Sequence, residues 1–344
     1  TTPMVRLVNK LHTLVVISMV CMAPFPAKGG DFFFLEERPY YDPLKAEVRG
    51  AMVKLLFPAL SKEFEYMPKK GERLIWDIQL GKEIPIFGYE SRAGRTIINP
   101  GEWGIGLWLP VSFHMAEDLS GGTNPIINTD YRFMGTVKAR FAWPNERWQL
   151  GLKLSAGHES THLGDEFSLA AQRTFAAFRR INVSYEFWEV AGSIEGALGK
   201  LGDSRVSLRA GIVGLFRPSS GLYSANSFEA NGQDVSLSAN AVESFYLAAQ
   251  YVFNERLLFK RYGPFVSLEA RGRLHYDYDK REDASPDTCR PGLNLLAGLW
   301  AARGRDERGY IDPYIRLYWG VNPHGQFRND SSYWLLGAGL SIDI

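Results

Sequence analysis

The most constraining feature of the chain is an alternation of apolar and polar side chains in two long runs joined by a short turn. Residues 131–141 and 148–156 place apolar side chains at every second position, and Trp143-Pro144-Asn145-Glu146 lies between them. A period of two predicts β-strands with one apolar and one polar face. Each run has about 10 residues, the length that a tilted strand needs to cross a bilayer. The pair therefore predicts a hairpin of a transmembrane barrel.

Similar alternation recurs along most of the chain. Eleven runs are clear, and because bacterial barrels have even strand numbers we predict 12 strands, with 10 or 14 as alternatives. The fold class that this pattern predicts is an all-β, antiparallel transmembrane β-barrel of about 12 strands with a short helical N-terminal extension. The runs are 74–80, 103–113, 131–141, 148–156, 181–187, 206–212, 245–253, 266–274, 293–299, 311–319 and 334–344. The last run, which reaches the final residue, resembles the assembly signal of outer-membrane barrels and implies the barrel-assembly machinery as a partner.

Composition agrees with a barrel and argues against other classes. The net charge of +1 gives no electrostatic basis for binding nucleic acid. Glycine (34 residues) and aromatic residues (13%) are abundant, as expected for a sheet with bends, turns and aromatic girdles. We expect a bacterial outer-membrane protein in contact with outer-membrane lipid and lipopolysaccharide.

The first 72 residues differ from the rest. A basic start, an apolar stretch over 14–22 and small residues near Ala27 predict a signal peptide over 1–27. Residues 28–72 form a predicted periplasmic or plug segment, because apolar side chains between Leu44 and Tyr66 recur at helical spacing. We predict an amphipathic helix there, packed on the barrel rim or inside it, and assign 73–344 to the barrel.

The polar faces of the predicted strands carry charges of both signs. Charged side chains are costly towards lipid and tolerated in a wet or ion-paired lumen. We therefore expect a lumen lined by Arg132, Lys138, Arg140, Lys153, Arg205, Arg209, Arg271, Arg273, Arg316, Glu186, Glu269 and Asp312.

The densest group of reactive side chains is His158-Glu159-Ser160-Thr161-His162, which continues to Asp165 and Glu166. It matches the H-E-x-x-H pattern of zinc peptidases, and an exported zinc peptidase is one hypothesis. That pattern binds zinc on a helix. Here the run continues a strand, in which the two histidines would be about 13 Å apart at 3.3 Å per residue. We predict no metal site and no cofactor.

A second hypothesis is an outer-leaflet lipid esterase or acylhydrolase. His158 and Ser160 share one face of a strand, and the phase of residues 152–156 makes it the lipid-facing side. The pair resembles the H-x-S arrangement of outer-membrane phospholipases and lipid A deacylases. That resemblance implies His158 as general base and Ser160 as nucleophile. Asn182 is a candidate third member, although its parity with Ser184 and Glu186 predicts that it points inward; Glu159 or Asp165 is the alternative.

A third hypothesis is structural. Acidic and basic side chains at the strand end would form an ionic cluster that orders a loop or lines the lumen, made of Glu159, His162, Asp165, Glu166, Arg179, Arg180 and Glu186. Under this hypothesis the chain is a channel, a transport component or a structural component of the envelope.

Residues 158–166 and 180–186 together resemble two blocks of a bacterial family described as domain of unknown function 1207. The resemblance implies an exported outer-membrane protein. It implies no activity, cofactor or catalytic residue.

Overall fold

The computed structural model describes residues 30–35, 44–64, 67, 70–91, 102–120, 124–143, 148–175, 183–198, 204–216, 224–225, 235–236, 242–253, 262–276, 286–301, 310–327 and 332–343. The predicted signal peptide lies outside these residues. Within them, no helix combines the length and the apolar character needed to cross a membrane.

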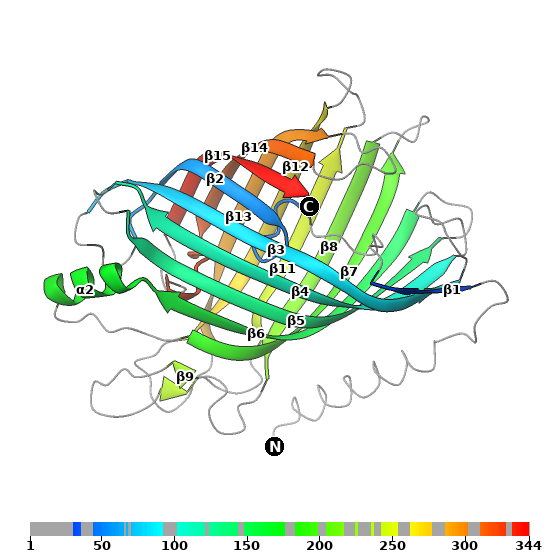
Figure 1. Ribbon diagram of the computed structural model, residues 1–344, viewed down its shortest axis with the longest axis horizontal. Coiled ribbons are helices and arrows are strands. Elements are labelled where there is room, and N and C mark those ends of the chain that lie inside the picture. The colour runs from blue at the N-terminus through cyan, green and yellow to red at the C-terminus, as the bar shows by residue number, and fades with distance from the viewer. Residues whose placement is uncertain are drawn as a thin grey trace.

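Twelve antiparallel strands form a closed barrel, which confirms the predicted fold class and strand number (Figure 1). Each strand pairs with its neighbours, and β2 pairs with both β3 and β15 to close the ring. The strands are β2 (Val53–Ser61), β3 (Arg73–Glu90), β4 (Trp103–Asp118), β5 (Ile126–Ala142), β6 (Trp148–Leu163), β7 (Val183–Leu198), β8 (Ser204–Leu215), β11 (Val242–Val252), β12 (Tyr262–Tyr276), β13 (Pro286–Ala301), β14 (Tyr310–Gly320) and β15 (Tyr333–Asp343).

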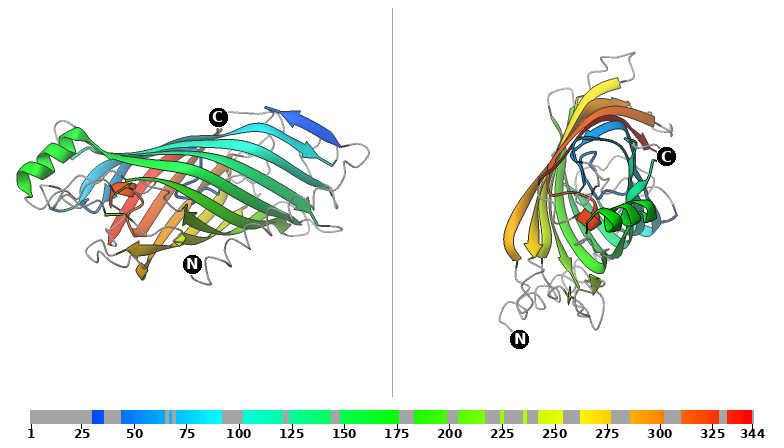
Figure 2. Two further views of the ribbon diagram at one scale, coloured as in Figure 1. Left: turned by 90° about the horizontal axis from the view of Figure 1, so that it is seen from below. Right: turned by 90° about the vertical axis from the view of Figure 1, so that its left-hand side faces the viewer.

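The remaining elements are short and lie at the barrel ends. Strand β1 (Asp31–Phe34) pairs with the end of β3, and helix α2 (Asp165–Thr174) follows β6 at the opposite end (Figures 1 and 2). Strands β9 (Ser224–Ala225) and β10 (Val235–Ser236) form a separate pair, and Gly325–Phe327 form a 3-10 turn. The two longest connections, 164–182 and 216–241, are at the α2 end. Since outer-membrane barrels have short periplasmic turns and longer external loops, we take this end as external.

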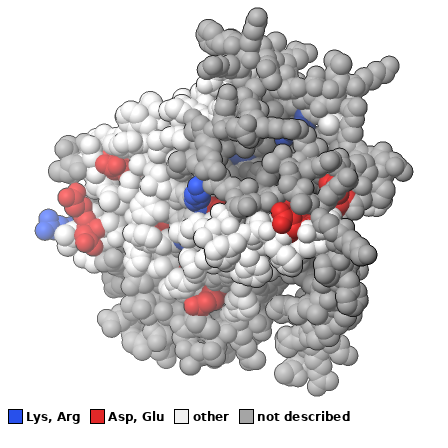
Figure 3. Space-filling model, turned by 45° about the vertical axis from the view of Figure 1, so that its right-hand side comes forward, with Lys and Arg blue, Asp and Glu red and all other residues white. Residues whose placement is uncertain are grey.

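The two faces of the wall have the predicted opposite character. Along β5 the side chains of Tyr131, Phe133 and Phe141 are exposed, whereas those of Arg132 and Lys138 are buried. On the face shown in Figure 3, charged side chains are few among the described residues. An apolar outer wall around a charged interior is the arrangement of a barrel surrounded by lipid. The closed barrel is therefore a bacterial outer-membrane protein.

We expect a charge in the middle of the outer wall to destabilise the barrel more than a charge near its edge. Ile315 is 61% exposed in the middle of β14, and Ile311 is 46% exposed on the same face near the start of that strand. Ile315→Arg should lower the free energy of unfolding in lipid vesicles by about 2–4 kcal/mol, and Ile311→Arg by about 0–1 kcal/mol. Urea titration measures both values. Equal losses would contradict a lipid-facing position for Ile315.

The helix predicted between Leu44 and Tyr66 is wrong for the residues described there. Residues Val53–Ser61 form β2, which is the twelfth strand and closes the barrel. The barrel wall consequently begins at Val53 rather than at residue 73. The helical spacing is misleading because Leu55 and Leu56 lie on opposite faces of a strand. Leu55 is half-buried on the outer face, and Leu56 is buried inside. Backbone pairing with two neighbouring strands outweighs a weak helical preference.

Residues 44–52 enter the lumen before β2 begins (Figure 1). Main-chain groups of this segment bond to side chains of the wall: the Ala46 amide donates to Ser267 Oγ at 2.9 Å and the Val48 amide to Glu269 Oε2 at 3.2 Å. Lys45 Nζ lies 2.8 Å from Asp312 Oδ2, and Glu47 pairs with Arg209. We call residues 44–52 the lumen segment. Its polar groups match the charged wall residues, which explains why it is buried without a helix.

Candidate functional site

The outer wall near the external end of β6 and β7 carries a group of polar side chains. The outward residues near the end of β6 are His158, Ser160 and His162. On β7, His158 lies opposite Glu186 and Ser160 opposite Ser184. Directly opposed residues on antiparallel strands have Cβ atoms about 4.5–5.5 Å apart. The alternation of β6 thus places its reactive side chains within reach of the side chains of β7.

On the other side of β6, strand β5 presents aromatic rings beside this group. Tyr131 is paired with Ser160 and Phe133 with His158, and both aromatic side chains are about half exposed. The Tyr131 ring lies 5.9 Å from the His162 ring, edge to face. The polar group therefore has an apolar, aromatic flank of the kind that contacts acyl chains at a membrane boundary.

His158 connects a serine hydroxyl to a carboxylate. Its Nε2 atom lies 3.3 Å from Ser184 Oγ, and its Nδ1 atom lies 3.2 Å from Glu186 Oε1. An ionised carboxylate only accepts hydrogen bonds, so Nδ1 donates to Glu186 and Nε2 is left to accept from the Ser184 hydroxyl. The order hydroxyl, imidazole, carboxylate is that of a serine hydrolase triad. The His158 side chain is 45% exposed and that of Glu186 32%, so a substrate can reach both.

A second contact lies beside the first. Ser160 Oγ is 3.0 Å from His162 Nε2, two residues along the same strand. The predicted pair of His158 with Ser160 is thus not the one that the structure brings together: His158 bonds to Ser184, and Ser160 to His162. Asn182, the predicted third member, lies outside the described residues.

The predicted ionic cluster is divided among several places. Glu159 is buried in the lumen, His162 is exposed outside, and Asp165 and Glu166 form the first turn of α2. Arg179 and Arg180 lie outside the described residues. Glu186 faces outward beside His158, so its predicted position in the lumen is wrong.

The structure also contradicts the predicted phase at the start of β7, that is, which of its side chains face lipid and which face the lumen. The alternation that predicts Glu186 in the lumen places Tyr185 and Phe187 on the lipid side, yet both are buried inside. The Arg132 guanidinium lies over the Phe187 ring at 4.1 Å, and Tyr185 belongs to the same internal apolar cluster. Ser184 was therefore missed as a site residue. The alternation Ser184-Tyr185-Glu186 places Ser184 and Glu186 on one face of β7. Because aromatic side chains pack inside the barrel here, that face is the outer one. Arg205, also expected inside, is exposed at the start of β8.

The H-E-x-x-H match lies in the extended strand β6, and α2 begins only at Asp165. His158 and His162 have different partners, Glu186 and Ser160 respectively. Two histidines four residues apart on a strand are separated by about 13 Å, too far for one zinc ion. The geometry does not support a zinc peptidase at this motif.

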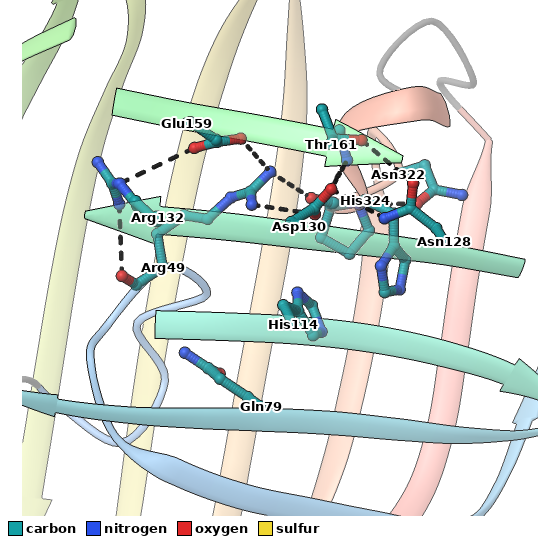
Figure 4. Close-up of polar contacts among 12 residues, drawn as sticks. Arg49, Gln79, His114, Asn128, Asp130, Arg132, Glu159, Thr161, Asn322 and His324 are labelled. Atoms are coloured by element: carbon teal, nitrogen blue, oxygen red, sulfur yellow. Dashed lines mark hydrogen bonds and ion pairs between the residues drawn. The ribbon is translucent and has the colours of Figure 1, made fainter. Parts of the chain in front are cut away.

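The inward side chains of the same strands form an ionic network around the lumen segment (Figure 4). Arg49 Nη1 lies 3.1 Å from Asp130 Oδ2, and Arg49 Nη2 lies 3.3 Å from Glu159 Oε1 and 2.7 Å from the carbonyl oxygen of Pro323. Burial by itself would lower the pKa of Arg49, but Glu159 and Asp130 hold that pKa above its usual value. Arg49 therefore remains a cation that links two strands to the lumen segment.

Comparisons with known proteins give similarity in fold only. No family model matches the chain, and no curated protein matches it. The resemblance to domain of unknown function 1207 is thus not confirmed. Among solved structures, outer membrane phospholipase A from Escherichia coli is 14% identical over 90% of this chain and 95% of that chain, with a TM-score of 0.46. The transport unit of the autotransporter AIDA-I from Escherichia coli is 10% identical over 88% and 93%, with a TM-score of 0.44.

A third structure, OccAB1 from Acinetobacter baumannii, is 9% identical over 90% of this chain and 99% of that chain, with a TM-score of 0.34. Similarities of this size say nothing about activity. What the strand pairing, the apolar outer wall and the charged interior establish is the architecture and its location: the chain is a 12-stranded antiparallel β-barrel of a bacterial outer membrane.

Proposed function

We propose that the barrel hydrolyses acyl esters of lipids in the outer leaflet, with Ser184 as nucleophile, His158 as general base and Glu186 as the residue that orients His158. The observation that carries the proposal is the continuous contact from Ser184 Oγ through His158 to Glu186 Oε1 on the outer wall. Both distances are at the long end for hydrogen bonds, as is common before a substrate binds.

The reaction that this arrangement supports is acyl transfer. Ser184 Oγ attacks the ester carbonyl carbon while His158 Nε2 accepts the hydroxyl proton, and the same nitrogen then gives that proton to the leaving alcohol oxygen. Water attacks the resulting acyl-serine, again with proton transfer to His158. The fatty acid leaves and Ser184 regains its hydrogen. Glu186 stabilises the imidazolium that forms in each step.

The position of the group supports a lipid as the substrate. Polar and ionisable side chains are costly on the lipid face of a barrel, and most at the midplane. These lie near the external end of the wall, beside the exposed rings of Tyr131 and Phe133. An ester group of a lipid occupies the same depth, between acyl chains and headgroup. Phospholipid and the acyl chains of lipopolysaccharide both present such esters.

The interior is less suited to the alternative function, a channel or transport component. The lumen segment lies inside the barrel and is held by buried ion pairs to β5, β6, β8 and β14. Those contacts favour an occluded barrel whose activity is on its outer wall. Assembly by the barrel-assembly machinery through β15 remains a prediction.

The test is release of fatty acid from phospholipid and from lipopolysaccharide by the purified full chain in mixed detergent micelles. Wild type should release fatty acid from one of the two, and Ser184→Ala should be slower by about 10⁶-fold. An ether-linked phospholipid, which has no ester carbonyl, controls for contaminating activity. Absence of release from both substrates by folded wild type would reject the hydrolase. Loss in Ser160→Ala with retention in Ser184→Ala would instead assign Ser160 as nucleophile.

A further inference from the structure

Residues 321–327, which follow β14, fold into the barrel at its external end. Val321, Asn322 and His324 are buried, and the Gly325 amide donates to both carboxylate oxygens of Asp130, at 3.3 and 3.1 Å. Arg49 of the lumen segment donates to the carbonyl of Pro323. We call residues 321–327 the inner loop. It brings an imidazole from a loop to the inner face of the strands β3 and β4 (Figure 4).

His324 meets two further metal-ligating side chains there. Asp77 projects from β3 and His114 from β4, and one ligand atom of each of the three residues lies within 4.8 Å of the other two. His114 Nε2 is 2.9 Å from Asp77 Oδ1, and His324 Nε2 is 3.5 Å from Asp77 Oδ2. All three side chains are at least nine-tenths buried. The two Nε2 atoms thus converge on the two oxygens of one carboxylate.

These distances suit an ion placed between the three groups. Zinc binds nitrogen and carboxylate oxygen at about 2.0–2.2 Å, so tetrahedral ligand atoms are roughly 3.3 Å from one another. The two distances of 2.9 and 3.5 Å bracket that value.

Unpartnered atoms are the second observation that points to a ligand. Asp77 Oδ2 and His324 Nε2 are buried and face one another at 3.5 Å, which is too long for a good hydrogen bond, and neither has another hydrogen-bond partner within the described part of the protein. A buried polar atom without a partner is costly. Asp77 Oδ1 is already contacted by His114 and by Arg316 Nη1 at 3.4 Å, which leaves Oδ2 as the oxygen that faces His324. An ion would satisfy both unpartnered atoms at once.

We propose that Asp77, His114 and His324 bind one divalent transition-metal ion of the zinc class inside the barrel. Two imidazoles and one carboxylate favour Zn²⁺, Co²⁺ or Ni²⁺ over Ca²⁺ and Mg²⁺, which prefer oxygen ligands. The ion joins the inner loop to β3 and β4 and so holds the external side of the lumen closed. This site is separate from Ser184 on the outer wall and does not depend on the proposed hydrolysis.

The test uses Co²⁺ as a spectroscopic probe. The folded full chain in detergent is stripped with EDTA, dialysed and titrated with Co²⁺ while its visible absorption is recorded. Wild type should bind about one ion with the intense bands of low coordination number. His324→Gln and His114→Gln should weaken binding by more than the 10–100-fold that loss of an outer partner costs. His162→Gln, which removes an exposed histidine, is the matched control and should bind like wild type.

Slower electrophoretic migration after heating shows that each variant was folded before titration. If His114→Gln does not fold, His324→Gln still decides the question, because His324 lies on the inner loop and not on a strand. Failure of folded wild type to bind Co²⁺ or Zn²⁺ would overturn the proposal. So would binding that is lost in His162→Gln and kept in His324→Gln, since the ion would then lie on the outer wall.

Discussion

Replacing His158 by Asn, Ser184 by Ala, or both together is expected to reduce lipid ester hydrolysis to the same low level. Each single variant should lose about 10⁶-fold in kcat, because the hydroxyl and the imidazole act as one unit and either is ineffective without the other. The double variant should lose little more. Initial rates of fatty acid release, measured for the three variants at saturating substrate, test this directly.

A double variant that loses little more activity than either single variant distinguishes a catalytic pair from a structural contact. If His158 and Ser184 only stabilised the rim of the barrel, their losses would be small and would reflect less folded protein. Glu186→Gln offers a further check, since it keeps a hydrogen-bond acceptor but removes the charge that stabilises the imidazolium. It should lower kcat with little change in KM. Multiplicative losses in the double variant would contradict a shared proton transfer between Ser184 and His158.

The second large effect is expected at Arg49. Arg49→Ala removes the cation that lies between Asp130 and Glu159, and leaves two buried carboxylates without it. Removing one partner of a buried ion pair costs about 3–5 kcal/mol. We expect that loss in the free energy of unfolding in urea. The lumen segment should also be held less firmly, so the barrel should conduct ions in planar bilayers where wild type does not.

The matched control is Arg205→Ala, which removes an arginine that is exposed at the start of β8. Exposed substitutions away from such contacts usually change stability by about 0.5 kcal/mol or less. Arg49→Lys keeps the charge but cannot reach both carboxylates and the Pro323 carbonyl in the same geometry, so an intermediate value is expected. Equal stability of Arg49→Ala and Arg205→Ala would contradict the role given to Arg49.

Eleven of the barrel strands could be predicted because they have one lipid-facing side. Lipid imposes a strict period of two on those strands, and the period is visible in any stretch of about 10 residues. The exception was β2, whose strand (Val53–Ser61) reads as a broken helix. The position of β2 in the barrel depends on pairing with β3, which follows it in the chain, and with β15, which lies far away in the chain. No local pattern encodes these pairings.

The candidate site was predicted in part. The strand phase correctly placed His158 and Ser160 on the outer wall, as their exposure shows. It did not identify Ser184, because the phase of β7 near its external end depends on what packs inside the barrel. The Arg132 guanidinium lies over the Phe187 ring there, and the Phe187 side chain packs inside the barrel. A cation beside a ring in a charged lumen stabilises a position that hydrophobicity alone assigns to lipid.

Periodicity in the sequence is enough to predict a membrane barrel of about 12 strands and the side of β6 that faces lipid. These follow from short-range periodicity, because each strand meets lipid and lumen on its own. The folded barrel is needed to show which hydroxyl meets His158, where residues 44–52 lie, and that His324 lies beside Asp77 and His114. Such contacts connect residues 26 to about 250 positions apart, and they depend on strand register and on loops folding inward. Register is set by the closure of the whole barrel.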